Sequence, residues 1–285
     1  MTDNSPSIDR RSALQALGSL TLAALAGCTG NGNSGTLSTS TTSTAGPFAS
    51  LGVQGTTLVA ELESDAEVDH VNLVKPNGSL FGTRDVAEGA SRVSFDVGTT
   101  YTPGEYTLVA VTGDQTVGTT TRVLRPDLQI LDMGIGRNQP EKMWNGTERE
   151  IADEAYVVVE NRGSGPGAVT KLLFIGDVPL PSTENGTNYV NNSDVSGIYD
   201  PETDSTTQTV VIPPGERRTV YSATSPFGFA PGGAITCMDH RQTGSFKLVL
   251  KTSLGDSLST TYDVTYSASE QVDNCSISIS EATDG

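Results

Sequence analysis

Histidine, cysteine and tryptophan are scarce in this chain of 285 residues, which contains two, three and one of them respectively. The sequence also has no G-x-S-x-G turn, no H-E-x-x-H helix and no glycine-rich loop of the kind that cradles phosphate. His70 falls in a predicted strand, where we expect packing or solvent exposure rather than catalysis. A carboxylate pair would suit a glycosidase, but 34 acidic residues give no means of selecting one pair. The sequence therefore predicts no catalytic residue and no cofactor, and we expect a protein that is not an enzyme.

Basic side chains are also few. Lysine and arginine number 17 against 34 acidic residues, giving a formal net charge of -17, and only five of the 17 are lysines. This balance argues against binding to nucleic acid and against docking of a folded surface on anionic lipid. High acid, low lysine and abundant Thr, Ser and Gly resemble proteins of halophilic archaea. An acidic secreted protein from an ordinary source is the alternative.

Long hydrophobic runs are missing as well. The N-terminal apolar run, Ala13 to Gly27, is too short to cross a bilayer of ~30 Å as a helix. A polar start, a short apolar run and small residues at its end are typical of an export signal over residues 1–27. The adjacent Arg10 and Arg11 favour the twin-arginine route. The sequence lacks the Phe-Leu-Lys that often follows the arginine pair in such signals.

The four residues "LAGC" that end at Cys28 resemble a lipobox. In lipoproteins of that kind the signal is cut before the cysteine, and the cysteine thiol carries the lipid. This resemblance implies that Cys28 anchors the protein on the extracellular face of the cytoplasmic membrane, with a plain cleaved signal or an uncleaved anchor as alternatives. Residues 28–47 are rich in Ser, Thr, Gly and Asn, a composition that cannot offset the entropy of folding, and they predict a flexible tether. Its hydroxyl groups could carry O-linked sugar.

Residues 48–125 read as a first folded domain made of short strands. Apolar residues alternate with polar ones, and "PNGS" at 76–79 predicts a hairpin turn. The expected strands lie within residues 56–63, 68–75, 91–97, 102–113 and 116–124. Their spacing predicts a small antiparallel sandwich. "PGEYTLVA" resembles the turn and penultimate strand of immunoglobulin-like domains, which implies that Tyr106 packs at the corner of the sandwich.

Residues 126–268 read as a second domain of strands. "DLQILDM", "YVVVENRGSGPG", "VIPPGERRTV" and "FKLVLKTS" resemble the adhesion-related, CARDB-like branch of immunoglobulin-like sandwiches. The residues that carry this resemblance are Asn161, Gly163 and Gly165 in one turn motif and Ile212, Pro214, Gly215, Glu216 and Val220 in the other. Because these motifs encode turns, they indicate the fold more than a function.

Three insertions depart from this pattern and are our candidates for a recognition surface. They are residues 137–150, which contain Trp144, residues 181–206, and residues 224–236. Loops this long in a compact domain are either functional or disordered. For any single aromatic residue in them, the alternative is that it covers the edge of the core. Residues 269–285 are expected to be a polar C-terminal segment outside the sandwich.

If Cys28 carries lipid, Cys237 and Cys275 remain as an even pair in an exported protein, and we expect a disulfide between them. The alternative is a zinc site, because Asp239 and His240 lie next to Cys237.

Acidic residues between 194 and 204 could hold a hard cation, although they lack the spacing of an EF-hand, and a solvated acidic loop is the favoured interpretation. These weak candidates are Asp194, Asp200, Glu202 and Asp204. Sequons for N-linked glycans begin at Asn77, Asn145, Asn185, Asn191 and Asn274. We expect some of them to be used.

Together these patterns predict an all-β protein with two immunoglobulin-like antiparallel β-sandwich domains after a signal peptide and a disordered linker. We expect a lipid-anchored cell-surface protein that acts without catalysis in adhesion, envelope structure or partner binding. Its partners would be the membrane, through the lipid on Cys28, and a protein or glycan at the cell surface. A solute- or cation-binding accessory subunit of a membrane complex and a surface glycan hydrolase are the alternatives.

Overall fold

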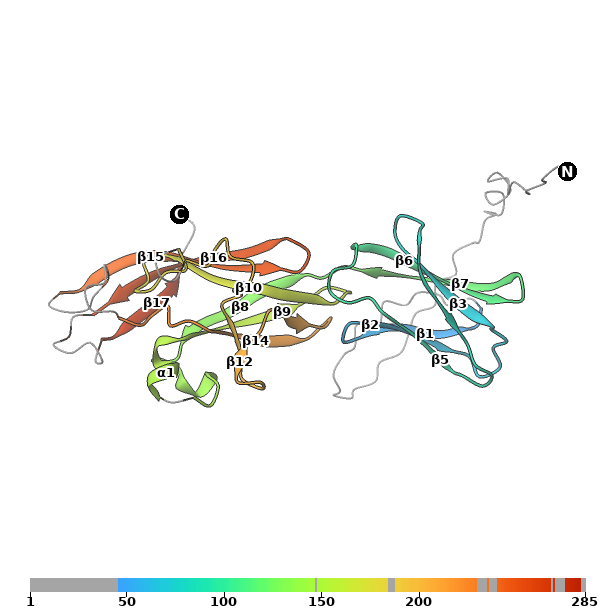
Figure 1. The fold of residues 1–285 in the computed structure, drawn as a ribbon, viewed down its shortest axis with the longest axis horizontal. Coiled ribbons are helices and arrows are strands. Elements are labelled where there is room, and N and C mark those ends of the chain that lie inside the picture. Colours follow the sequence, from blue (N-terminus) through green and yellow to red (C-terminus); the bar gives the residue numbers. More distant parts are fainter. Residues whose placement is uncertain are drawn as a thin grey trace, which may run out of the picture. The chain divides into compact units, whose positions relative to one another are not determined.

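The computed structural model describes residues 46–146, 148–183, 188–229, 235, 240–267, 269 and 275–282. All of them belong to one compact unit, residues 42–285, in which strands predominate (Figure 1). The export signal with Arg10 and Arg11, the predicted lipid site Cys28 and all but two residues of the tether lie outside the described residues. No helix in the described part of the chain has the length and apolar character needed to cross a membrane.

Residues 46–124, here called the first sandwich, form two antiparallel sheets. One sheet has the strand order β1-β2-β5 and the other has the order β4-β3-β6-β7. The strands are β1 (Phe48–Gln54), β2 (Thr57–Leu62), β3 (His70–Val74), β4 (Leu80–Asp85), β5 (Arg92–Asp96), β6 (Gly104–Thr112) and β7 (Gln115–Leu124). The five strands expected from their residue ranges are present, β4 is the second strand of the hairpin predicted at 76–79, and β1 was not predicted. This arrangement of three and four strands is that of an immunoglobulin-like sandwich.

The core of the first sandwich follows from alternation along its strands. In β5, Val93 and Phe95 are buried while the residues between and beside them face solvent. In β6, Tyr106 is buried and its hydroxyl donates a hydrogen bond to the carbonyl oxygen of Thr102 at 3.1 Å. This bond to a backbone group just upstream is the tyrosine corner that the resemblance implied. The predicted hairpin turn is also present, with Gly78 at φ 81°.

Residues 128–281, here called the second sandwich, form two larger sheets. Their strand orders are β12-β11-β14-β9-β8 and β13-β10-β15-β16-β17, and every pair is antiparallel. The strands are β8 (Leu128–Ile135), β9 (Ala155–Asn161), β10 (Gly167–Gly176), β11 (Ile198–Asp200), β12 (Ser205–Thr206), β13 (Val210–Ile212), β14 (Arg217–Ser222), β15 (Gln242–Thr252), β16 (Ser257–Tyr266) and β17 (Ile277–Glu281). The first insertion contains the short helix η1 (Pro140–Lys142) and the start of the short helix α1 (Glu148–Asp153).

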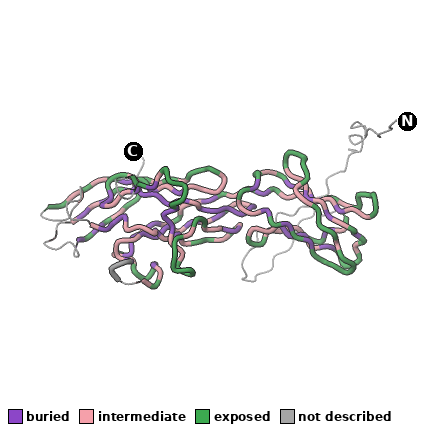
Figure 2. The backbone as a smooth tube through the Cα atoms, in the orientation of Figure 1, coloured by how far each residue is buried: buried purple, intermediate pink, exposed green. Residues whose placement is uncertain are grey.

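Buried backbone runs through the middle of both sandwiches, with exposed turns at the ends of the strands (Figure 2). Each sandwich has its own hydrophobic cluster. In the second, Phe174, Phe227 and Phe246 meet edge-to-face or tilted, with ring centroids 5.6 to 6.3 Å apart, and Tyr262 stacks on Phe246 at 5.5 Å. The hairpin of β15 and β16 supplies two of these rings, Phe246 and Tyr262.

The end of the chain corrects one prediction. Residues 277–281, expected in a polar segment outside the sandwich, form β17 and pair with β16. Ile277 is buried in the core and Ile279 packs partly against it, while Ser278 and Ser280 alternate with them. The alternating serines lower the average hydropathy of this segment, which is why composition indicated a polar tail instead of an edge strand.

The two turn motifs of the CARDB-like resemblance meet at one buried side chain, Asn161. Its Oδ1 accepts hydrogen bonds from the backbone N–H groups of Asp127 and Gly163, at 3.1 and 3.0 Å. Its Nδ2 donates to the carbonyl oxygens of Gly165 and Ile212, at 2.9 and 2.8 Å. Asn161 therefore ties the start of the second sandwich, the glycine-rich turn and the end of β13 together.

Candidate binding site

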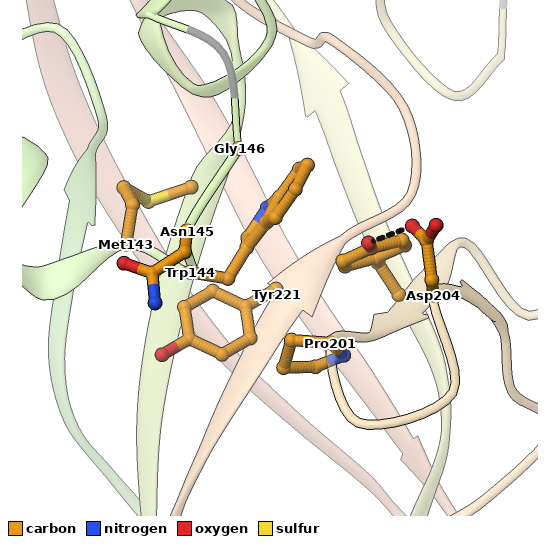
Figure 3. A pocket seen from close by; sticks show the side chains of 8 residues that line it. Met143, Trp144, Asn145, Gly146, Pro201, Asp204 and Tyr221 are labelled. Carbon is orange, nitrogen blue, oxygen red and sulfur yellow. Dashed lines mark hydrogen bonds between the residues drawn. The ribbon is translucent and has the colours of Figure 1, made fainter.

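An open hollow of about 620 Å³ lies where the first two insertions meet. Residues 143–146 come from the first insertion, residues 199–204 come from the second, and β14 supplies one further side chain. The hollow is lined by Met143, Trp144, Asn145, Gly146, Tyr199, Pro201, Asp204 and Tyr221, and we call it the aromatic hollow (Figure 3). Two of the three predicted recognition loops therefore contribute to one site.

Two of the lining residues belong to a row of tyrosines on three neighbouring strands. Tyr199 of β11 pairs with Tyr221 of β14, and Tyr221 pairs with Tyr156 of β9. Directly paired residues lie on the same face of a sheet. Tyr156 is fully buried, and Met143 of the first insertion and Ile151 of α1 pack against it. Tyr199 and Tyr221 are only partly covered and line the hollow. Burial raises the pKa of Tyr221.

The first insertion is fixed to the body of the sandwich by polar contacts. Arg137 Nη2 lies 2.6 Å from Asp153 Oδ1, an ion pair between partly buried groups. Asn138 Nδ2 donates to the carbonyl oxygen of Ile277 at 2.7 Å, which connects the insertion to the last strand. The ends of the insertion are joined by the bond from Gly136 N to Glu154 O at 3.0 Å. These contacts hold the segment that carries Trp144 in one position.

Trp144 is held at both ends of its ring. Its indole N–H donates to Glu154 Oε2 at 2.8 Å, and its ring centroid lies 4.5 Å from that of Tyr199, with the planes tilted by 41°. A Cβ atom on Gly146 would come within 2.4 Å of the indole, so glycine at this position gives the ring its space. Trp144 packs against the buried side chains of Met143, Ile151 and Tyr156 and also lines the hollow, and its part in a recognition surface stays a prediction.

The second insertion is ordered in part as short strands. β11 pairs with both β12 and β14. The hydroxyl of Tyr199 donates to Asp204 Oδ1 at 2.6 Å, which fixes this ring against the turn that follows it. Asp204 has φ 49°, a left-handed conformation that aspartate tolerates better than most residues. Figure 3 shows this bond at the side of the hollow opposite Asn145.

A buried lysine of β10 anchors the start of the second insertion. Lys171 is only 7% exposed, and its Nζ donates to the carbonyl oxygens of Tyr189 at 2.9 Å and Asn192 at 2.5 Å. Burial, followed by the nearby charge of Lys251, lowers the pKa of Lys171. The same carbonyl groups also accept from backbone N–H groups, that of Tyr189 from Asn192 at 3.1 Å and that of Asn192 from Val195 at 3.4 Å, so the lysine joins this turn to β10.

The acidic residues proposed as weak cation ligands form turn contacts. Asp200 accepts from the backbone N–H of Glu202 at 3.0 Å and from the hydroxyl of Thr203 at 2.9 Å. Asp194 Oδ1 lies 3.3 Å from the hydroxyl of Ser193. Within the residues that the structure describes, no group of three or more His, Cys, Asp or Glu is placed to hold a metal ion.

The third expected recognition loop behaves differently in its described part, residues 224–229. Phe227 is fully buried among Phe174 and Phe246, as the alternative interpretation of the loop aromatics stated. Phe229 packs edge-to-face on Tyr266, with ring centroids 5.8 Å apart. These two phenylalanines complete the core and do not line the aromatic hollow.

The predicted modification sites are accessible where the structure describes them. Asn77, Asn145 and Asn191 are exposed, and Asn145 lies in the lining of the aromatic hollow. Asn185 and Asn274 lie outside the described residues. The use of each sequon stays a prediction.

Cys275 is buried and disulfide-bonded. Cys237 and Asp239 lie outside the described residues, so the pairing of Cys237 with Cys275 stays a prediction. His240, which the alternative zinc site would use, is exposed, and its Nε2 lies 3.1 Å from Nε2 of Gln242.

Sequence reasoning missed Tyr199 and Tyr221 as site residues. A signal for Tyr221 was present, because alternation along β14 places it on the face opposite the buried Val220. No local signal marked Tyr199, which stands in a long polar stretch and gains its place through pairing with Tyr221.

No known protein family matches the chain, and no curated protein matches it in sequence. Among solved structures, a glycosyl hydrolase family 2 member from Bacteroides cellulosilyticus is 14% identical with a TM-score of 0.21, over 73% of this chain and 24% of the hydrolase. A segment of two fibronectin type III domains from chicken tenascin is 14% identical with a TM-score of 0.23, over 78% of this chain and 96% of the segment. The chain spans about a quarter of the length of the hydrolase. The strand orders themselves assign both sandwiches to the immunoglobulin-like class.

Proposed function

We propose that this protein is a lipid-anchored surface module that binds a partner through the aromatic hollow and catalyses no reaction. The observation that carries the proposal is the meeting of two insertions, residues 137–150 and 181–206, around one hollow. Each insertion is fixed by its own polar contacts, at Arg137 and at Lys171. Rigid loops that present aromatic side chains on a sandwich are a common way of building a recognition site.

The proposed location rests on the N-terminal sequence. Arg10 and Arg11 precede a short apolar run, "LAGC" ends at Cys28, and a Ser/Thr-rich segment follows. Export by the twin-arginine route and lipidation of Cys28 would place both sandwiches outside the cytoplasmic membrane of a halophilic archaeon. An oxidising exterior would also favour a disulfide between Cys237 and Cys275.

Two observations favour binding over hydrolysis. The lining of the aromatic hollow contains one carboxylate, Asp204, whereas glycosidases use two. The Tyr199 hydroxyl donates a hydrogen bond to that carboxylate at 2.6 Å. A solute-binding accessory subunit is the second candidate, because the volume of about 620 Å³ falls in the range of small-molecule pockets.

A pair of measurements on the full chain tests anchoring and binding separately. Intact-mass analysis of the membrane fraction should give a protein that begins at Cys28 and carries lipid, whereas Cys28→Ala should carry none. An N-terminus at Met1, or a Cys28 without lipid, would overturn the anchoring claim.

Binding is then tested in the Cys28→Ala background, where no lipid holds the protein. We expect this protein to sediment with envelope preparations in high salt, and we expect Tyr199→Ala with Tyr221→Ala to reduce the retained fraction at least fivefold. Leu80→Ala is the matched control, because Leu80 is a 57% exposed apolar residue of the first sandwich. Equal retention of the hollow variant and the control would overturn the binding claim.

A further inference from the structure

The lining of the aromatic hollow limits the charge of what it binds. Among the described residues, seven side chains and one glycine line it and none of them is a lysine or an arginine, and the chain as a whole carries a formal net charge of -17. Phosphate, sulfate and carboxylate ligands are normally held by cationic side chains or by helix N-termini. An anionic ligand would therefore meet repulsion without a compensating partner in this site.

The arrangement of the rings argues against a cage for a small cation. In such cages separate ring faces surround an ammonium group within about 6 Å of each centroid. Here the rings of Trp144 and Tyr199 contact each other at 4.5 Å, and Tyr221 is the cross-strand neighbour of Tyr199. The contacting rings of Trp144 and Tyr199, with Tyr221 on the neighbouring strand, line an open hollow and do not form an enclosing box.

A neutral sugar matches the chemistry of this wall. A pyranose ring presents a face of C–H groups, which packs on aromatic faces, and a rim of hydroxyl groups that both donate and accept hydrogen bonds. Asn145 offers an amide that can donate and accept, and Asp204 offers carboxylate oxygens that accept. From the apolar wall, these polar groups and the uncharged or acidic character of the described lining, we infer that the aromatic hollow binds a neutral saccharide.

The rings are already in place for such a ligand. The indole N–H of Trp144 donates to Glu154 and the hydroxyl of Tyr199 donates to Asp204, so neither ring needs to be reoriented on binding. Fixed aromatic side chains lose little conformational entropy when a ligand is bound, which favours affinity. The site would thus add a ligand class to the proposed function, on which this inference rests.

The single tryptophan makes the inference directly measurable. Trp144 is the only tryptophan in the chain, so intrinsic tryptophan fluorescence reports on this hollow alone. The protein to be titrated is the Thr147→Ala variant of the full chain, which cannot carry a glycan on Asn145 because its sequon is lost. The probes are neutral di- to tetrasaccharides of glucose, galactose, mannose and N-acetylglucosamine, in constant high salt.

We expect at least one saccharide to change the fluorescence of Trp144 saturably. Tyr221→Ala should weaken the binding of that saccharide about tenfold or more, and a tenfold change corresponds to about 1.4 kcal/mol. Gly146→Ala keeps the fluorophore but places a Cβ where the indole lies, and it should weaken binding by a similar factor. Leu80→Ala should bind as the parent does.

Three results would overturn the inference. The first is the absence of a saturable response to every saccharide, and the second is an equal response in Tyr221→Ala. The third is saturation by tetramethylammonium chloride beyond a sodium chloride control, with no response to sugar, which would identify a cation site. If any of these occurs while envelope retention still depends on Tyr199 and Tyr221, the proposed function stands and only the ligand class is wrong.

Discussion

In the first sandwich, the large exposed apolar side chains Leu80, Val117 and Val123 stand singly, and no two aromatic residues are cross-strand partners within residues 46–124. In the second sandwich, Tyr199, Tyr221 and Tyr156 follow one another across three strands, and Trp144 lies beside them. Both halves use the same alternation to build a core. The two halves differ in that inserted chain covers an outer face of the second sandwich. Under the proposed function, the first sandwich is a spacer and the second is the binding half.

The two sandwiches also differ in their buried polar groups. In the first, the buried residues are apolar or tyrosine apart from Thr120. In the second, Asn161, Lys171, Ser182, Ser196 and Ser222 are buried, and each has a hydrogen bond to backbone. Such groups are costly when their partners are lost. The free energy of unfolding of the second sandwich should therefore fall more when a single buried polar side chain is removed. Its long insertions depend on such side chains for hydrogen bonds.

The largest effect should come from Asn161→Ala. This change removes the partner of two partly buried N–H groups and of two buried carbonyl groups, and we expect a loss of about 3–5 kcal/mol in the free energy of unfolding. Asn77→Ala is the matched change in the first sandwich, where the amide is exposed and accepts only from Ser79, and it should cost less than about 1 kcal/mol. Hydrogen exchange followed by mass spectrometry measures both halves. Equal losses in the free energy of unfolding for Asn161→Ala and Asn77→Ala would contradict the difference between the two sandwiches.

The next effect concerns the cross-link that only the second sandwich can have, because residues 46–124 contain no cysteine. Cys275→Ser should lower the free energy of unfolding of the second sandwich by about 3–4 kcal/mol if Cys275 pairs with Cys237. Cys237→Ser should have the same effect, and the double change should add nothing. Denaturant unfolding followed by Trp144 fluorescence provides the measurement. A non-reduced peptide map that joins Cys275 to another residue would contradict the pairing.

A smaller effect should appear at high pH. Burial, with the charges of Glu281 and Asp132 contributing, raises the pKa of Tyr262 from 10.0 to about 12. A group whose pKa is raised on folding stabilises the fold fully below its unfolded pKa, and this contribution is lost as the pH rises through the folded value. The second sandwich should lose stability between pH 10 and about 12. Tyr262→Phe should flatten that slope in thermal unfolding, whereas an unchanged slope would assign it to other groups.

The smallest effect should come from an exposed ion pair of the first sandwich. Arg92 Nε lies 3.8 Å from Glu61 Oε1, and the two side chains are 50% and 41% exposed. Arg92→Gln should change the free energy of unfolding by no more than about 0.5 kcal/mol, and less in high salt. Thermal unfolding at low and high salt measures this. A loss above 1 kcal/mol would mean that surface charge and not the core decides the stability of the first sandwich.

The strands were predictable because a half-buried strand repeats every two residues. Val93 and Phe95, and the hairpin of β15 and β16, show this most clearly. The turn motifs around Asn161 could be recognised as motifs. Their hydrogen-bonded centre could not be predicted, because the four backbone groups bonded to this amide lie in three separate segments of the chain. β17 was missed because serines dilute its two isoleucines.

The site was predictable only at the level of its loops. Length and polarity marked residues 137–150 and 181–206 as insertions, and tryptophan marked one of them. The register that sets Tyr199 beside Tyr221 depends on tertiary pairing, which no local pattern encodes. The acidic run was interpreted as a solvated loop with a weak option for a cation, and sequence did not predict that Asp200 and Asp204 accept hydrogen bonds in the turn that positions Tyr199.

Photo-crosslinking in living cells compares the two halves most directly. A benzophenone amino acid would replace Pro201, which lines the aromatic hollow, or Leu80, which is exposed on the first sandwich. If the second sandwich is the binding half, irradiation should give a defined adduct from position 201 and none from position 80. An adduct of equal yield from position 80, or from that position alone, would contradict the division into a spacer and a binding half.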